Sequence, residues 1–221
     1  MKAIVPPVLA AALLGACSQL PWTGGGSSLV LEDAERFAAL FADGRVPGAP
    51  LLKSEYLDRG TPGVAIFTPN RIQNAENLAK AVAGNTAAYR RAISVCLPAA
   101  RQMQDEASTI IARIGAMLGE PEAATAYVVF GAGNSGGTAG AEGLVLGLEV
   151  ICFLADSAPA VKQVLRDFIA HEMAHVYQSR AGVKESADDL LHQSMVEGFA
   201  DFVMERVLEG AARTGTERQA Y

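Results

Sequence analysis

Histidines 171 and 175 stand four residues apart in the segment His171-Glu172-Met173-Ala174-His175. Side chains at positions i and i+4 of an α-helix project from the same face, one turn apart. On a helix, therefore, both imidazoles reach one metal ion, and Glu172 lies beside the first of them. The spacing predicts a helix with His171 and His175 as metal ligands and Glu172 as the base that takes a proton from an attacking water.

A second pair of polar residues follows at the same spacing. Glu197 lies 22 positions after His175, and Asp201 lies one helical turn beyond Glu197. This distance leaves room for the first helix to end, a loop, and a second helix that returns to the first. We predict that Glu197 is the third metal ligand, and that Asp201 accepts the free N–H of a ligating histidine, His171.

Local signals place the ends of these two helices. Gly182, soon after Arg180, predicts the end of the first helix. The second helix has three alternative N-caps, which are Ser186, Asp188 and Asp189. The first helix is expected to open near Asp156 or Ser157, with Pro159 in its first turn.

This arrangement, H-E-x-x-H on one helix and E-x-x-x-D on the next, resembles the thermolysin-like zinc peptidases called gluzincins. The resemblance covers roughly residues 125–205 and implies a zincin-like α+β domain, mostly helical, with a small sheet packed on the motif helix. It also implies one Zn²⁺ held by His171, His175 and Glu197, with Glu172 as general base, Asp201 as support, and a peptide or protein substrate. Residues 136–149 look like the stretch before the motif in uncharacterised bacterial predicted zinc proteases.

Two further expectations come from the gluzincin resemblance. In gluzincins an edge strand just before the motif helix pairs with the substrate backbone, and Leu144–Glu149 is the candidate here. Gluzincins also use a Tyr or His from beyond the third ligand to stabilise the oxyanion, but only Tyr221 follows Glu197. His192 and Tyr177 are the other candidates. This gap, and a tail without a compact closing element, indicate that the C-terminal part is short or truncated.

The amino terminus reads as a targeting segment. Lys2 is followed by an apolar run, Val8 to Leu14, that is too short to span a bilayer. Leu14-Gly15-Ala16-Cys17 resembles the lipobox of bacterial lipoproteins. The resemblance implies a signal peptide over residues 1–16, a lipidated Cys17, and, with Ser18 next, an outer-membrane anchor facing the periplasm. A plain secretory signal or a buried cysteine are the alternatives for this segment.

The rest of the chain divides into a glycine-rich tether within residues 17–28 and one domain over residues 29–221. Apolar spacing predicts helices over 29–41, 74–83, 86–95 and 98–118, strands over 126–130 and 143–154, and a strand or buried loop over 64–67. Glycines in 131–143 predict a loop or hairpin beside the active site. This segment lacks the Gly-Lys-Ser/Thr ending of a phosphate-binding loop.

Cysteine and charge content add two constraints. Cys96 and Cys152 would face an oxidising compartment, so either they form a disulfide or they are two unpaired buried side chains. The net charge is −6 and no basic block is present, which argues against a nucleic-acid partner.

Together these features predict a zinc metallopeptidase tethered to the bacterial envelope. The alternative is a zinc-binding envelope lipoprotein without turnover that acts as a partner-binding module. A metal-dependent hydrolase of non-peptide substrates also stays open at this point.

Overall fold

The computed structural model of the chain describes residues 28–120, 122–182 and 189–208. The predicted signal peptide, Cys17 and nearly all of the tether lie outside these ranges, as do Ser186, Asp188 and Tyr221. Within these ranges, no helix combines the length and the apolar character needed to cross a bilayer.

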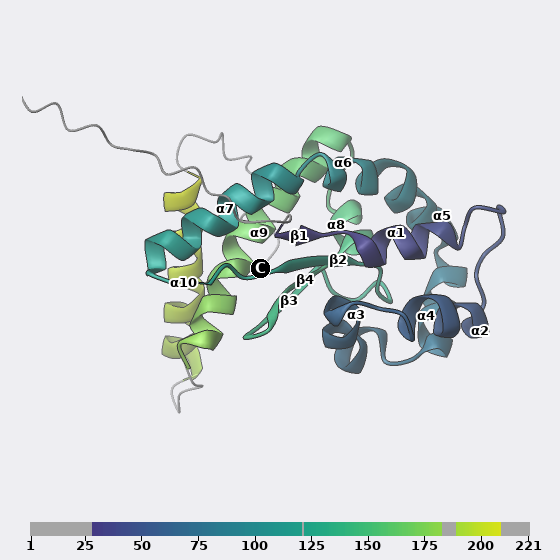
Figure 1. Cartoon of the computed structure of the whole chain (residues 1–221), viewed down its shortest axis with the longest axis horizontal. Helices are drawn as coiled ribbons and strands as arrows, with labels where there is room; N and C mark the ends of the chain where they lie inside the picture. Colours follow the sequence, from purple (N-terminus) through teal and green to yellow (C-terminus); the bar gives the residue numbers. More distant parts are fainter. Residues whose placement is uncertain (1–27, 121, 183–188, 209–221) are drawn as a thin grey trace, which may run out of the picture.

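A small mixed sheet lies at the centre of the described residues (Figure 1). Its strand order is β1-β2-β4-β3; β1 pairs with β2 and β2 with β4 in parallel, whereas β3 and β4 form an antiparallel hairpin. The strands are β1 (Leu29–Val30), β2 (Ala126–Val129), β3 (Gly137–Gly140) and β4 (Gly143–Gly147). All five residues of β4 are buried, which fits a strand with a neighbour on either side.

Helices make up most of the rest, so the predicted mostly helical α+β class is confirmed. The segment between β1 and β2 holds α1 (Glu32–Ala39), α2 (Ala49–Leu52), α3 (Pro62–Phe67), α4 (Ala75–Gly84), α5 (Thr86–Arg91), α6 (Leu97–Arg101) and α7 (Gln104–Leu118). Three π-helical segments continue or join these helices, namely η1 (Lys53–Leu57), η2 (Thr68–Ile72) and η3 (Ala92–Cys96). After the sheet come α8 (Leu148–Phe153), α9 (Ala158–Arg180) and α10 (Asp189–Val207).

Several predicted boundaries were wrong. The apolar run 64–67 lies in α3, because Thr61 caps a helix whose first turn contains Pro62. The predicted strand 143–154 ends at Gly147, and its second half is α8. The predicted helix 29–41 begins with β1, and the predicted helix 98–118 is interrupted between α6 and α7.

A group of aromatic side chains forms the core between α1, η1, α5 and β2. The rings of Phe37 and Phe130 stack with centroids 4.4 Å apart. The Tyr56 hydroxyl donates to the Phe130 carbonyl at 2.8 Å, and the Tyr89 hydroxyl donates to the Gly131 carbonyl at 2.7 Å. These bonds fix the chain where it leaves β2, just before the hairpin.

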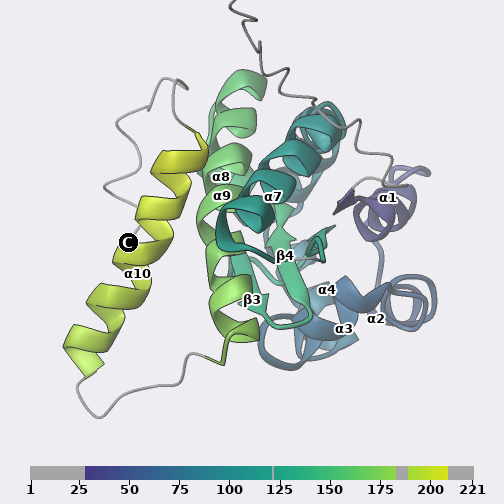
Figure 2. The same ribbon diagram turned by 60° about the vertical axis from the view of Figure 1, so that its left-hand side comes forward.

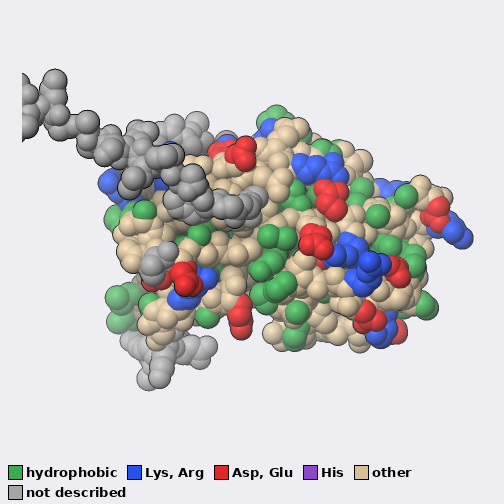
Figure 3. Space-filling model, in the orientation of Figure 1, with side chains coloured by type: hydrophobic (Ala, Val, Ile, Leu, Met, Phe, Trp, Pro, Cys, Tyr) green, Lys and Arg blue, Asp and Glu red, His purple; other side chains and the backbone are tan. Residues whose placement is uncertain are grey.

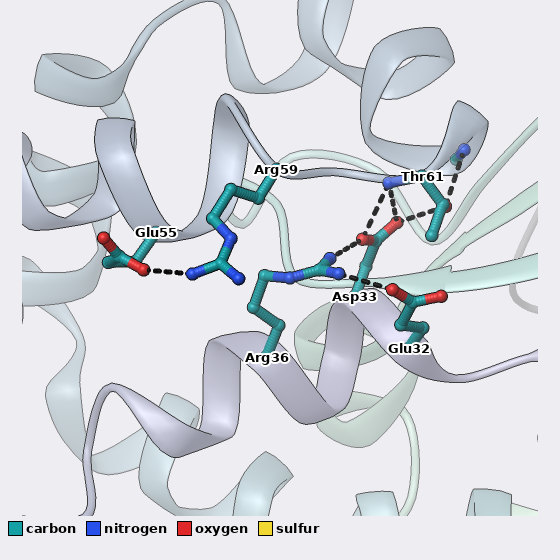
Figure 4. Close-up of polar contacts among 7 residues, drawn as sticks. Glu32, Asp33, Arg36, Glu55, Arg59 and Thr61 are labelled. Atoms are coloured by element: carbon teal, nitrogen blue, oxygen red, sulfur yellow. Dashed lines mark hydrogen bonds and ion pairs between the residues drawn. The ribbon is translucent and has the colours of Figure 1, made fainter.

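A buried carboxylate joins α1 to the start of α3. Asp33 is almost fully buried and accepts hydrogen bonds from the backbone N–H and hydroxyl of Thr61 and from the Arg36 guanidinium (Figure 4). Arg36 also pairs with Glu32. Because a buried charge is tolerated only when it is paired and hydrogen-bonded, this network fixes how α1 meets α3. Elsewhere, Figure 3 shows acidic and basic side chains interspersed on the face that carries α1.

Cys96 and Cys152 form a disulfide that joins the end of η3 to α8, with Cα atoms 5.8 Å apart. Arg91 reinforces this junction, because its guanidinium donates to the carbonyls of Cys152 and Ala155. Of the two alternatives for these cysteines, the structure contains the bonded one.

Candidate metal centre

The metal motif lies in the middle of α9, the longest described helix. The helix begins as expected, with the Ser157 hydroxyl accepting a hydrogen bond from Ala160 N–H, and it ends before Gly182, whose φ is +74°. One face of α9 packs on the β3–β4 hairpin and on α7 (Figure 2). His171 faces α10, where it contacts Glu197 and Asp201, and is only 2% exposed.

The second helix, α10, returns antiparallel along α9 and brings its carboxylates to the histidines. The His171 Nε2 atom lies 3.1 Å from His175 Nε2 and 3.2 Å from Glu197 Oε2. The distance from His175 Nε2 to Glu197 Oε2 is 3.4 Å. His171, His175 and Glu197 thus form a cluster able to hold a metal ion, although exposed acidic groups also occur without one.

Asp201 lies where the sequence predicts it, one turn beyond Glu197. Its Oδ1 atom is 3.1 Å from His171 Nδ1. An ionised carboxylate only accepts hydrogen bonds, so this contact requires the proton of His171 on Nδ1. In the neutral imidazole, Nε2, which faces His175 and Glu197, then carries the lone pair.

Gln178 contacts His175 Nδ1 as Asp201 contacts His171 Nδ1, and the sequence analysis did not predict this role. Its amide nitrogen donates to the Val196 carbonyl at 3.1 Å, so its oxygen faces His175 Nδ1, 2.7 Å away. This contact places the His175 proton on Nδ1. The missed signal was the spacing, since Gln178 lies three residues after His175 and therefore on the same face of the helix.

With both protons on Nδ1, the centre of the cluster contains only acceptors. Two imidazole lone pairs and one carboxylate oxygen converge within 3.1–3.4 Å of one another. Such an arrangement is stabilised when a proton or a metal cation lies between the three atoms. In a tetrahedral zinc site with bonds of about 2.0–2.1 Å, ligand atoms are separated by roughly 3.3–3.4 Å. The donor set and its spacing therefore fit Zn²⁺.

Glu172 lies next to this cluster in a dry environment. Burial raises the pKa of its carboxyl group, while the nearby imidazoles of His175 and His171 act in the opposite direction. A Cβ placed on Gly137 of β3 would lie 3.7 Å from the Glu172 Cγ atom. The Glu172 side chain therefore lies between the imidazoles and the β3 strand.

The predicted edge strand was wrong. β4 contains Leu144 to Gly147 and lies inside the sheet between β2 and β3. Glu149, the other end of the predicted segment, belongs to α8 and accepts hydrogen bonds from the backbone N–H groups of Gly131 and Gly133. Among the four strands described, β3 is the edge next to α9.

Among the described residues, neither candidate for an oxyanion donor hydrogen-bonds to His171, His175 or Glu197. The Tyr177 hydroxyl is buried and accepts a hydrogen bond from Ala124 N–H, on the α7 side of α9. His192 lies five residues before Glu197, which places it about 140° around α10 from that ligand. The third candidate, Tyr221, lies outside the described residues.

Comparison with protein-family models, with curated proteins and with solved structures gave no match. The geometry of the cluster and the motif spacing therefore carry the functional argument alone.

Proposed function

We propose that the chain is a zinc-dependent peptidase in which His171, His175 and Glu197 hold one Zn²⁺. The observation that carries the proposal is the convergence of His171 Nε2, His175 Nε2 and Glu197 Oε2, each 3.1–3.4 Å from the others, while the Nδ1 atoms of both histidines face Asp201 and Gln178. A zinc ion in such a site supplies Lewis acidity, which makes water a nucleophile at neutral pH.

Residues of the chain would supply the proton transfer and the orientation of the imidazoles. Glu172, with its pKa raised by burial, is suited to accept a proton from the attacking water and to deliver it to the leaving amine. Asp201 and Gln178 hold the imidazoles in one tautomer and one orientation. Because Glu172 is partly buried beside β3, a carbonyl bound along this strand meets both the base and the metal ligands.

We assign substrate binding to the free edge of β3 (Gly137–Gly140). Its other edge pairs with β4, and its residues are small. An extended peptide can add to such an edge through main-chain hydrogen bonds, with little steric restriction by strand side chains. This assignment replaces Leu144–Glu149, which lies in β4 and α8.

The proposed setting is the bacterial envelope, with the domain held by a lipid on Cys17. The support is the Leu14-Gly15-Ala16-Cys17 sequence, followed by the glycine-rich segment that separates it from β1. Two or more acyl chains anchor a protein stably without a membrane-spanning helix. Cys17→Ser is expected to move the protein from the detergent-extracted membrane fraction to the soluble fraction.

The peptidase proposal is tested with Glu172→Gln in zinc-loaded protein. The wild type is expected to cleave members of a mixed peptide library, and the variant to lose at least about a hundredfold in rate while it binds zinc equally well. Glu76→Gln, an exposed change on α4, is the matched control and should retain full activity. Equal rates for wild type and Glu172→Gln would remove Glu172 from the mechanism.

A zinc-binding module without turnover is the second candidate. It is favoured by the solvent exposure of Glu197 and Asp201, whose side chains are 45% and 53% exposed, and by the position of Tyr177 in the core. Wild-type protein that binds one zinc per chain and cleaves no peptide in the library would support this candidate over the peptidase.

A further inference from the structure

Helix α10 is apolar on two separate faces. Its inner face packs on α9 and α7 through Ala200, Val203, Met204 and Val207. A second apolar stripe follows the outer face at helical spacing and consists of Leu191, Met195, Phe199 and Phe202, which are 57%, 67%, 38% and 54% exposed. A surface helix normally keeps one apolar face, and one that is apolar on two sides is usually covered on both.

The position of α10 leaves the outer stripe facing away from the domain. In Figure 2 the helix stands at the side of the molecule, with α9 between it and the sheet. On the helix, Glu197 and Asp201 lie on a different side from the four stripe residues, about 80–160° around the axis. Covering the stripe therefore leaves the metal cluster accessible.

Gly198 lies within this stripe, with nine helix residues on either side of it. A Cβ at this position would meet no atom within 4 Å. Glycine in the middle of an exposed helix costs about 1 kcal/mol relative to alanine. Nothing in the described residues uses the space that it leaves, whereas a second helix crossing at this point would use it for close approach.

The size of the stripe matches an ordinary protein interface. Side chains of this size bury about 150–250 Å² each, so the four together expose roughly 400 Å² of apolar surface. Pairing two such stripes removes up to about 800 Å² of apolar surface, and if the contact has the usual apolar share of a little over half, its total area is roughly 1,400 Å². This area is in the range of stable complexes.

The occupant must be apolar and must not depend on positive charge from α10. Residues 209–221 contain no Leu, Ile, Val, Phe or Met, so this part of the chain offers little to cover the stripe. An anionic membrane surface favours helices rich in Lys and Arg, but α10 has four acidic residues and only one basic residue, Arg206. A second copy of the same stripe is apolar and matches it in length.

We propose that the protein forms a two-fold symmetric homodimer in which the α10 helices cross antiparallel at Gly198. Around such an axis, Phe199 of each copy lies over Gly198 of the other, and Met195 of each copy lies opposite Phe202 of the other. A large side chain thus meets a small one, and a thioether meets an aromatic ring. This inference does not depend on the proposed peptidase activity.

The test is the mass of the purified full chain in detergent, measured by light scattering that separates protein from detergent mass, over a wide range of concentration. The wild type is expected to be a dimer that dissociates on dilution. Phe202→Glu should weaken the dimer on the order of 30-fold or more, because it places a charge against Met195 of the other copy inside the apolar contact. Phe153→Glu, which changes an exposed phenylalanine on α8, should leave the dimer unchanged.

Gly198→Leu provides the second variant, in case Phe202→Glu disturbs folding. Leucine favours helix and has open space here, so the thermal midpoint of the monomer should stay the same or rise. The dimer dissociation constant should nevertheless increase on the order of tenfold or more, because the helices are held apart. A wild type that stays monomeric at every concentration, or a Cys17→Ser protein that floats as a monomer with phosphatidylglycerol vesicles, overturns the proposal. A dimer unaffected by either stripe variant also overturns it.

Discussion

At the scale of single residues, the protons on two imidazoles decide what the cluster can bind. Asp201 and Gln178 each accept from an Nδ1 atom, at 3.1 Å and 2.7 Å. In the neutral imidazoles, both Nε2 atoms therefore direct their lone pairs toward the Glu197 carboxylate. A histidine pair without these two neighbours could rotate or exchange tautomers, and the cluster would lose its preorganisation.

Gln178→Leu is expected to weaken zinc binding about 10–100-fold, because His175 loses the acceptor that fixes its tautomer and α10 loses a contact at Val196. Competition with a zinc-binding dye measures this change. Gln163→Leu on the same helix is the control, since Gln163 binds Asp167 instead of a ligand. Equal zinc affinity in the two variants would contradict the assigned role of Gln178.

Glu149 supports the loop that leads to β3, and its environment predicts a pH effect. Burial is the main cause that raises its pKa above 4.5, against the backbone hydrogen bonds from Gly131 and Gly133. The folded state then binds the proton more tightly than the unfolded state, so this group's contribution to stability is present below about pH 4.5 and is lost as pH rises through the raised pKa.

Glu149→Gln should therefore gain stability relative to wild type as pH increases from about 4.5 towards neutral. Urea unfolding at several pH values measures the difference in free energy of unfolding between the two proteins. Glu142→Gln, at an exposed position in the hairpin loop, serves as the control. A difference between Glu149→Gln and wild type that does not change with pH would show that the carboxyl group does not titrate in this way.

At the scale of elements, two helices and one hairpin build the site. Helix α9 carries three of the motif residues, α10 carries two carboxylates, and β3 closes over Glu172. The other described helices contribute no residue to the cluster and support α9, α10 and the hairpin by packing. The disulfide between η3 and α8 is one such support, because α8 immediately precedes α9 in the chain.

Removal of the disulfide by Cys96→Ala with Cys152→Ala should lower stability by roughly 4 kcal/mol in the chain-entropy picture, since the bond closes a loop with a sequence separation of 56. Denaturant unfolding measures the loss. Zinc affinity should change little, because neither cysteine touches the cluster. A large fall in zinc affinity in a folded double variant would contradict this separation of support and site.

At the scale of the whole molecule, α10 is the element whose stability we expect to depend most on a bound metal ion. It packs on the domain along one face, while its other faces are exposed. Binding of a metal to α9 and α10 together should stabilise the folded state by about 4 kcal/mol when zinc is present at a thousandfold excess over its dissociation constant.

Chelation of zinc should therefore speed amide hydrogen exchange in α10 far more than in β2 and β4. Mass spectrometry of peptides from 189–207 and from the central strands measures this contrast. His175→Ala is the control, because its exchange should not respond to the chelator. Uniform protection changes across the chain would instead indicate that metal binding stabilises the molecule as a whole.

Some features of the protein follow from the sequence alone. The i, i+4 spacings in α9 and α10 predict which residues face the same way, because the period of a helix fixes the positions of side chains one turn apart. The cluster of His171, His175 and Glu197, and the contact of Asp201 with His171, follow from that rule and a returning helix.

Other features were decided only by the tertiary structure. Local pattern could not tell that β3 is the edge and β4 the interior strand, because strand order depends on pairing between distant segments. The acceptor role of Gln178 depends on Val196, eighteen residues away. Which of the two apolar faces of α10 is buried and which is exposed depends on how the helix packs on α9. Spacing within one helix is a local property, whereas burial and hydrogen-bond partners depend on which elements meet.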